Sequence, residues 1–248
     1  MSVLGIIPAR YASTRFPGKP LVEILGKSMI RRVYEQAMAT STLSDILIAT
    51  DDERIANHVK DFGGKYVMTS PDHPSGTDRC YEALVNSGIQ ADYVINIQGD
   101  EPFIHPSQID LLAEKCDGNT ELATLMIRCD SSDVLFDKGE VKIVLNTNGE
   151  ALYFSREVIP HLRNVPSEKW HLEHNYFRHV GMYAYRSDVL QKLTSLPASS
   201  LEKAESLEQL RWLENGFKIK LALTDFDSHC IDSPDDIPKV LRLMGLVQ

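Results

Sequence analysis

Short apolar runs alternate with amphipathic segments along the first 120 residues of the chain. The apolar runs have the length of strands, and the segments between them carry apolar residues at helical spacing. We predict strands at residues 3–7, 45–50, 65–69 and 92–100, and helices at residues 28–39, 52–63 and 77–88. This alternation is typical of an α/β protein with a mostly parallel sheet and helices on both faces.

From about Glu121 the predicted strands follow one another more closely. They cover residues 121–129, 141–146, 151–156 and 179–186, and the sequence NTNG at 146–149 predicts a hairpin turn. A helix is expected over residues 201–215, with Ser199 and Glu202 as a capping box and Gly216 as its end, and another begins near Ser233. We therefore expect an antiparallel excursion in the second half. No linker or repeat interrupts the chain, which favours a single domain over residues 1–248.

The formal net charge of −9 argues against sequence-independent binding to nucleic acid, which requires a basic face. The four cysteines, Cys80, Cys116, Cys129 and Cys230, form no C-x-x-C pair, so neither a zinc site nor a redox motif is indicated. No apolar run approaches the ~20 residues that span a bilayer. The first residues lack a basic region typical of a signal peptide. We expect a cytoplasmic protein with no nucleic-acid or membrane partner.

The first predicted strand leads into a basic loop, IIPARYASTRFPGKPL, at residues 6–21. It holds Arg10, Arg15 and Lys19 beside Ser13, and it matches neither G-x-x-x-x-G-K-[ST] nor G-x-G-x-x-G. With few glycines, it would have to hold an anion through arginine and lysine side chains, and phosphate is the best candidate. The alternative is a solvated turn that carries cations by chance.

Two further loops follow predicted strands, where ligands bind in open α/β sheets. In NIQGDEP, Asp100 at the tip of a buried strand, next to Gly99, is suited to Mg²⁺, although it could instead cap the helix expected near Pro106. In HPSGTDR, the small residues at 75–77 could contact a ligand through hydroxyls and helix-end amides. They could equally provide only an N-cap.

Eight stretches taken together resemble the sugar nucleotidyltransferases that activate acidic sugars with CTP. They span nearly the whole chain in order: IPARYASTRFPGKPL, ATDDERI, HPSGTDR, NIQGDEP, ALYFSR, FRHVGMYAYR, LEQLRWLENG and IDSPDDI. The resemblance implies a Rossmann-like three-layer α/β/α nucleotidyltransferase fold with a mainly parallel central sheet. It also implies a CTP-binding part at about residues 1–120 and a sugar-binding and dimerisation part at about residues 121–230.

The resemblance implies a role for particular residues. The triphosphate would be held by Arg10, Ser13, Arg15 and Lys19, and the cytidine by Ser75 and Arg79. The magnesium cofactor would be bound by Asp100 and Asp232, which with Arg10, Arg15 and Lys19 form the catalytic set. The sugar would be bound by Gln98, Arg156, His179, Tyr183, Glu205 and Gln209. A homodimer is implied, built near Phe177 to Arg186.

Several of these positions have structural alternatives. Without the resemblance, Asp232 in IDSPDD would read as a turn or cap, and His179 as a structural histidine. Tyr183 and Tyr185 alternate with apolar residues, so one of them is expected to be only a packed aromatic. Glu205 and Gln209, four apart, are expected to share one helix face.

The reaction implied is transfer of a cytidylyl group from CTP to the acidic eight-carbon sugar 3-deoxy-manno-octulosonate (Kdo), with release of pyrophosphate, for lipopolysaccharide synthesis. The nearest alternatives are 8-amino-Kdo or a sialic acid as acceptor. A noncatalytic nucleotide-binding protein on the same fold is a rival from another class. A dinucleotide-dependent oxidoreductase is disfavoured because no G-x-G-x-x-G follows the first strand.

Overall fold

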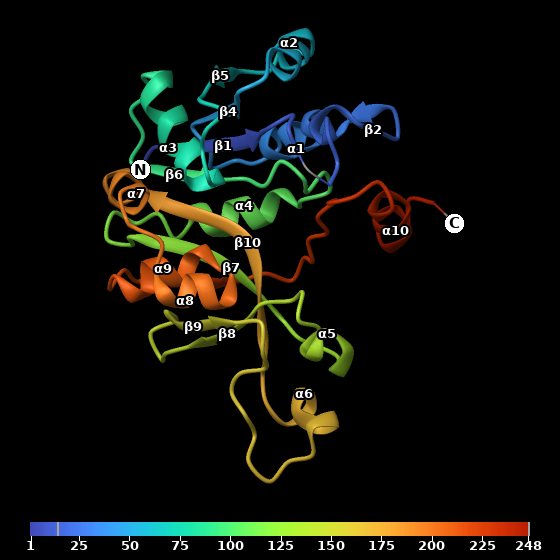
Figure 1. Cartoon of the computed structure of the whole chain (residues 1–248), viewed down its shortest axis with the longest axis vertical. Helices are drawn as coiled ribbons and strands as arrows, with labels where there is room; N and C mark the ends of the chain where they lie inside the picture. The colour runs from blue at the N-terminus through green and yellow to red at the C-terminus, as the bar shows by residue number, and fades with distance from the viewer. Residues whose placement is uncertain (14, 248) are drawn as a thin grey trace. The chain divides into compact units, whose positions relative to one another are not determined.

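The computed structural model of the chain describes residues 1–13 and 15–247. It contains two compact units (Figure 1). One is formed by Met1–Ala113 together with the C-terminal segment from Ser228, and the other by Glu114–Asp227. The prediction of a single domain whose parts divide near residues 120 and 230 stays a prediction.

Four parallel strands form the sheet of the first unit, in the order β6, β1, β4, β5. Their bounds are β1 Val3–Ala9, β4 Asp45–Thr50, β5 Tyr66–Met68 and β6 Tyr93–Asn96. β1 has a neighbour on each side, and its Ile6 and Ile7 are fully buried, as expected for a central strand of a parallel sheet. The predicted parallel sheet is confirmed.

Helices follow these strands along the chain, and the first four of them pack against the sheet. The helices are α1 Met29–Met38, α2 Glu53–Asp61, α3 Gly76–Ser87, α4 Pro106–Ala113 and α10 Asp236–Leu243, with a 3₁₀ turn η1 Lys19–Leu21 and a small hairpin of β2 Glu23–Ile24 and β3 Lys27–Ser28. Asp52 and Ser75 cap α2 and α3 by accepting backbone N–H groups. Gly63 and Gly88, which follow these helices, have φ values of 77° and 67°, so the predicted helix ends are confirmed.

The second unit is built around antiparallel strands. β10 pairs antiparallel with β7 and β8, β8 pairs antiparallel with β9, and β11 lies parallel to β7. The bounds are β7 Leu122–Arg128, β8 Lys142–Leu145, β9 Ala151–Ser155, β10 Phe177–Arg186 and β11 Ile219–Leu223. At the predicted NTNG turn, the N–H of Gly149 donates a hydrogen bond to the carbonyl of Asn146 at 3.1 Å. The antiparallel excursion is confirmed, whereas β11, a short parallel strand, was not predicted.

The helices of the second unit are short. They are α5 Ser132–Phe136, α6 Trp170–Glu173, α7 Ser187–Thr194, α8 Ser200–Glu205 and α9 Glu208–Glu214, with a 3₁₀ turn η2 Ser167–Lys169. α5 and α6 carry Leu135 and Trp170 into a small buried cluster with Cys129 and Tyr176. The residues between the strands of this unit therefore have an apolar core of their own.

The single helix expected over residues 201–215 is wrong, because α8 and α9 are separate. Ser206 lies between them in the left-handed region, at φ 54°, and the N–H of Leu207 donates to the carbonyl of Glu202 at 3.2 Å. The break redirects the chain so that Leu207 and Leu210 are both buried. The capping box of Ser199 and Glu202 is confirmed.

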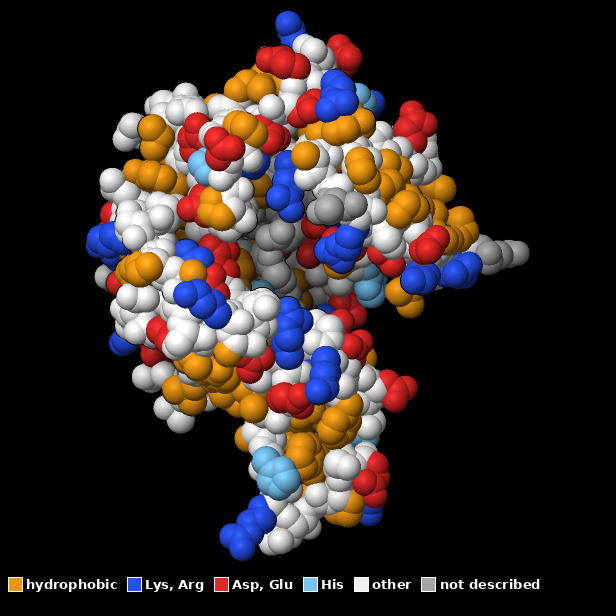
Figure 2. Space-filling model, in the orientation of Figure 1, with side chains coloured by type: hydrophobic (Ala, Val, Ile, Leu, Met, Phe, Trp, Pro, Cys, Tyr) orange, Lys and Arg blue, Asp and Glu red, His pale blue; other side chains and the backbone are white. Residues whose placement is uncertain are grey.

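Basic and acidic side chains are interspersed over the face of the molecule in Figure 2. This fits a chain in which 35 acidic residues outnumber 26 lysines and arginines. The cations that the sequence gathers at residues 10–19 are therefore a local feature that needs a local explanation.

The left-handed backbone at Ser206 leads to a stability prediction. Replacing exposed Ser206 with glycine should raise the free energy of unfolding by about 1 kcal/mol, because glycine adopts this region without steric cost. Ala204→Gly, at an exposed position inside α8, is the matched control and should lower the free energy of unfolding by a similar amount. Urea unfolding of both variants measures this, and a destabilising Ser206→Gly would contradict it.

Candidate functional site

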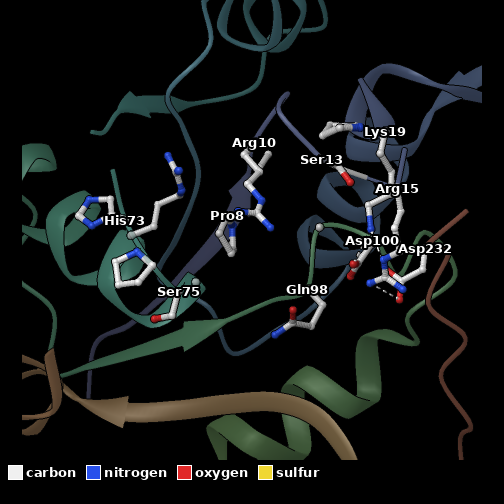
Figure 3. Close-up of a pocket in the computed structure, with 16 residues that line it drawn as sticks. Pro8, Arg10, Ser13, Arg15, Lys19, His73, Ser75, Gln98, Asp100 and Asp232 are labelled. Atoms are coloured by element: carbon white, nitrogen blue, oxygen red, sulfur yellow. Dashed lines mark hydrogen bonds and ion pairs between the residues drawn. The ribbon is translucent and has the colours of Figure 1, made fainter. Parts of the chain in front are cut away.

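A pocket of about 390 Å³ lies in the first unit, where β1 and β6 end (Figure 3). These strands run parallel with Ile6 opposite Asn96, so the residues that follow them emerge at the same edge of the sheet. The pocket is lined by nine residues predicted from the sequence: Arg10, Ser13, Arg15, Lys19, Ser75, Arg79, Gln98, Asp100 and Asp232. The fold thus brings the predicted nucleotide and metal residues together.

Lys19 joins the two predicted metal-binding carboxylates. Its Nζ lies 2.8 Å from Oδ2 of Asp100 and 3.2 Å from Oδ1 of Asp232, and its side chain is only 14% exposed. Nη2 of Arg15 lies 3.1 Å from the other carboxylate oxygen of Asp232. Figure 3 shows these four side chains converging at one corner of the pocket. Arg15 and Lys19 of the basic loop are therefore directed at carboxylates rather than scattered over a solvated turn.

The backbone brings the two aspartates together. The N–H of Ile231 donates to the carbonyl of Asp100 at 2.9 Å. Asp236 provides the cap in this turn, since its Oδ2 accepts the N–H groups of Asp232 at 3.1 Å and of Ser233 at 2.8 Å. The carboxylate of Asp232 is thus left to face the pocket, and the reading of Asp232 as a cap is not supported.

Asp100 likewise faces Lys19 rather than the start of α4. The turn before α4 is closed by Gln108, whose Oε1 accepts the N–H of His105 at 3.0 Å. Gly99 beside Asp100 is needed for close packing, because a Cβ there would lie 2.6 Å from the carbonyl oxygen of Pro8. The end of β1 thus packs directly against Gly99.

The oxygen donors in this corner fit magnesium. Mg²⁺ is commonly held by one or two carboxylates together with water and phosphate oxygens. Within residues 1–13 and 15–247, no group of three or more His, Cys, Asp or Glu side chains could hold a metal by itself. Asp100 and Asp232 converge on one cation, the ammonium of Lys19. The pair is therefore suited to a metal that arrives with a phosphate ligand.

Arg10 and Ser13 have different surroundings from Lys19. Arg10 is exposed, and its side chain makes no hydrogen bond or ion pair with the described residues. The hydroxyl of Ser13 accepts the N–H of Phe16 at 3.3 Å, which helps to shape the loop. Arg10 is thus a pocket cation that an anionic ligand can reach without breaking an existing ion pair.

The third predicted loop has a structural role and also lines the pocket. Ser75 caps α3, with its Oγ accepting the N–H of Asp78 at 3.2 Å and donating to the Asp78 carboxylate at 2.6 Å. Arg79 is 4% exposed, and its Nη1 donates to Thr69 Oγ1 at 2.6 Å while Nη2 lies 3.5 Å from Asp51. The expected N-cap at Ser75 is confirmed, and a role of either residue toward cytidine stays a prediction.

His73 is a pocket residue that the sequence reasoning missed. Its Nε2 contacts Oε2 of Glu82, which also accepts the N–H of Ser70 at 2.8 Å. Burial opposes ionisation of Glu82, but hydrogen bonds from His73 and Ser70 outweigh it and keep the pKa of Glu82 below its usual value. The motif HPSGTDR contains His73, but nothing in its spacing distinguishes a ligand from a loop residue.

Five predicted sugar-binding residues lie in the second unit, and Arg156 and Glu205 contact each other. The Glu205 carboxylate accepts the Ser155 hydroxyl at 2.7 Å and the N–H of Arg156 at 3.0 Å. Nε of Arg156 donates to the carbonyl of Glu205 at 2.9 Å, at the end of α8. The expectation that Glu205 and Gln209 share one helix face is wrong, because they lie on α8 and α9.

His179 is held as a neutral imidazole. Its Nε2 lies 2.8 Å from Thr124 Oγ1, whose hydroxyl donates to the carbonyl of Met182 at 2.7 Å, so Nε2 carries the proton and Nδ1 is an acceptor. The rings of Phe154 and Tyr183 lie on either side, at 5.4 and 5.1 Å between centroids. Burial in this packing lowers the pKa of His179 to about 3.

Tyr183 and Trp212 each bury a polar atom that has no partner among the described residues. These atoms are Oη of Tyr183 and Nε1 of Trp212, whose rings meet edge to face at 4.9 Å. Burial raises the pKa of Tyr183 well above its usual value. Gln209 is 5% exposed and lies in α9, the helix that also contains Trp212. Tyr185 is a fully buried core residue, as expected for one of the two tyrosines.

Comparison with known proteins gives a family for the whole chain. The cytidylyltransferase family matches residues 4–219. A Parabacteroides distasonis protein named 3-deoxy-manno-octulosonate cytidylyltransferase is 53% identical over 251 residues, covering 99% of each chain. A Shewanella halifaxensis protein named 8-amino-3,8-dideoxy-manno-octulosonate cytidylyltransferase is 46% identical over 241 residues, covering 96% of each chain.

A solved structure agrees with these relatives. It is described as CMP:2-keto-3-deoxy-manno-octonic acid synthetase complexed with CTP, and it is 42% identical to this chain. The TM-score is 0.90, and the match covers 99% of both chains. The predicted α/β nucleotidyltransferase fold is thereby confirmed.

The lowered pKa of His179 predicts a pH dependence of stability. The unfolded chain protonates this histidine below about pH 6.5, whereas the folded chain does so only near pH 3, so folding loses free energy as the pH falls between these values. Between pH 7 and pH 5, the free energy of unfolding should fall by about 2 kcal/mol more for wild type than for His179→Gln. Urea unfolding at both pH values measures this, and equal losses would contradict it.

Proposed function

The chain belongs to the cytidylyltransferase family, and from that premise we propose that it transfers the cytidylyl group of CTP to Kdo, giving CMP-Kdo and pyrophosphate. The anomeric hydroxyl oxygen of the sugar forms a bond to the α-phosphorus. The bond between that phosphorus and the bridging oxygen to the β-phosphate breaks, and the hydroxyl proton is released. The observation that carries the proposal is the pocket corner in which Asp100 and Asp232 face Lys19 and Arg15.

The basic loop is proposed to hold the triphosphate. Arg10 is accessible, and Arg15 and Lys19 can exchange their contacts with aspartate for phosphate oxygens. Placed along the phosphates, these cations offset the charge that develops on the departing pyrophosphate. Ser75 and Arg79, which also line the pocket, are proposed to face the nucleoside.

Asp100 and Asp232 are proposed to hold Mg²⁺. When bound, Mg²⁺ would lower the pKa of the attacking hydroxyl and neutralise phosphate charge. The side chains of this chain then contribute mainly by positioning and charge stabilisation, since phosphoryl-type transfer requires little covalent work from the protein. No side chain is assigned as a separate general base.

The acceptor residues are proposed to be Gln98 and the group in the second unit. Arg156 is suited to the sugar carboxylate, and Glu205 to its hydroxyls. His179 offers the unprotonated Nδ1 as an acceptor for a hydroxyl. Tyr183 and Gln209 complete the group. The Oη of Tyr183 has no partner within residues 1–13 and 15–247, which supports a polar ligand there.

A second acceptor deserves a direct test because of one relative. The Shewanella halifaxensis protein, at 46% identity, is named for 8-amino-3,8-dideoxy-manno-octulosonate. The two sugars differ at a single substituent. Kdo is the first candidate because the more similar Parabacteroides distasonis relative is named for it.

The cellular setting and the assembly are also proposed. The product would supply lipopolysaccharide synthesis, in the cytoplasm, and a homodimer would form near Phe177 to Arg186. Free thiols at Cys80, Cys116, Cys129 and Cys230 fit a reducing compartment. Among the described residues, no helix is long and apolar enough to cross a membrane. Sedimentation of the purified chain tests the dimer.

Pyrophosphate release tests the proposed reaction. The purified chain is assayed with magnesium and each of the four NTPs against Kdo, 8-amino-Kdo and N-acetylneuraminate. Release with CTP and Kdo above all other pairs is expected. Release with 8-amino-Kdo in its place would assign the alternative acceptor, and no release in any combination would refute the proposed enzyme.

The metal assignment predicts that Asp100→Asn leaves the fold intact and lowers kcat by at least about 100-fold, because one of the two magnesium ligands loses its charge. Asp130→Asn removes an 83% exposed carboxylate outside the pocket and is the matched control. Steady-state kinetics at several magnesium concentrations, with circular dichroism for the fold, measures both. Near-wild-type turnover of Asp100→Asn would contradict the assignment of Asp100 as a magnesium ligand.

A further inference from the structure

The loop that carries the pocket cations is closed at its neck by one residue. The carbonyl of Tyr11 accepts the N–H of Ser13 at 2.9 Å and the N–H of Gly18 at 2.9 Å. Arg15 lies within the loop, and Lys19 follows it directly. The position of Tyr11 therefore determines where these two cations enter the pocket.

The ring of Tyr11 lies against Gly18 at this neck. Gly18 has φ 73°, a region that side chains disfavour, and a Cβ there would lie 3.1–3.2 Å from atoms of the Tyr11 ring. Both the backbone conformation and the tight contact require glycine. The two ends of the loop are thus joined by a hydrogen bond and by packing.

Arg54 covers the Tyr11 ring. Its guanidinium carbon lies 3.3 Å from the ring centroid, the geometry of a cation–π contact. Asp52 orients that guanidinium through two hydrogen bonds, Nε to Oδ1 at 2.9 Å and Nη2 to Oδ2 at 2.6 Å. Hydrogen bonds from Arg54 hold the pKa of Asp52 below its usual value despite some burial.

The support for this stack is rigid. Asp52 is the N-cap of α2, where it accepts the N–H of Arg54 at 2.9 Å. α2 is anchored through Ile55, Ala56 and Val59, which are fully buried. Neither Asp52 nor Arg54 lines the pocket. A positioning effect of this pair on a ligand would therefore pass through Tyr11.

We propose that Asp52, Arg54 and Tyr11 are positioning residues that preorganise the cation loop for the triphosphate of CTP. This inference rests on the proposed function of that loop. Holding the neck in place before the ligand arrives reduces the conformational entropy that binding must remove. The affinity for CTP is raised in this way without any contact between the stack and the nucleotide.

A simple charge effect is the main rival explanation. It predicts the opposite change in CTP affinity for Asp52→Asn. Removing the negative charge of Asp52 should strengthen the binding of an anion by long-range attraction. Loss of positioning should weaken it, because Arg54 is released from its orientation over Tyr11. Asn caps helices as well as Asp does, so Asp52→Asn preserves the start of α2.

The experiment is calorimetric titration of the full chain with CTP and magnesium, together with steady-state kinetics on Kdo. Asp52→Asn and Arg54→Ala should each raise the Kd and the KM for CTP about 2–5-fold, the effect of an exposed cation–π contact, with kcat and the KM for Kdo unchanged. Tyr11→Phe keeps the ring and should match wild type, whereas Tyr11→Leu should resemble Arg54→Ala.

Asp45 and Lys65 are the matched controls. They form another exposed ion pair in the first unit, with Lys65 Nζ 2.8 Å from Asp45, and the Lys65 side chain is 60% exposed against 59% for Arg54. Asp45→Asn and Lys65→Ala make the same charge changes and should leave CTP affinity unchanged.

The CTP affinities of these variants either support or overturn the inference. Tighter or unchanged CTP binding by Asp52→Asn overturns the inference while leaving the proposed function in place, provided that wild type binds CTP and releases pyrophosphate. A wild-type chain that binds no CTP overturns both. Weaker binding in Asp52→Asn and Arg54→Ala, with wild-type behaviour of Tyr11→Phe and of the controls, supports the stack.

Discussion

The parallel pairing of β1 with β6 is the constraint on which the candidate site depends. It sends the residues after Ala9 and after Asn96 to one edge of the sheet, where a basic loop meets an acidic one. The end of β1 and the segment after β6 come so close that only glycine fits at position 99, next to the Pro8 carbonyl. The return of the C-terminal segment is then fixed by the hydrogen bond from Ile231 to Asp100, which delivers Asp232 to the same corner. One pairing of strands thus assembles carboxylates and cations from three distant parts of the chain.

The charges at this corner neutralise one another. Lys19 bridges Asp100 and Asp232, and Arg15 takes the remaining oxygen of Asp232. Such contacts between partly exposed side chains contribute little to stability, so exchanging them for a ligand costs little. In the proposed function, a magnesium–triphosphate would replace both sets of partners at once, with a cation for the aspartates and anions for Lys19 and Arg15. The proposed stack of Arg54 on Tyr11 would keep the loop ready for that exchange.

The candidate residues of the second unit differ from those of the first unit, because their polar groups lie among packed aromatic rings rather than in ion pairs. His179 is kept neutral and directed by Thr124, and Tyr183 lies between His179 and Trp212. Buried polar atoms usually have partners, so the Oη of Tyr183, which has none among the described residues, is an unusual cost for a core. A sugar hydroxyl would remove that cost. Arg156, by contrast, already holds the end of α8 through the carbonyl of Glu205, a structural role that the sequence did not suggest.

Local sequence patterns are enough to predict most strands and helices of the first unit, although not β2 and β3, together with the NTNG hairpin, the Ser199 capping box and the three loops that bear charge. These follow from hydrophobic periodicity and from cap and turn chemistry, which act between neighbours in the chain. Only the tertiary structure decided the break at Ser206, where burial of Leu207 and Leu210 outweighs the helical preference of the segment, and the pairing of β11. It also decided which role each polar residue takes. Asp232 and Asp236 are alike in sequence terms, yet one faces Lys19 and the other caps a turn, because only folding determines which carboxylate has a cation within reach.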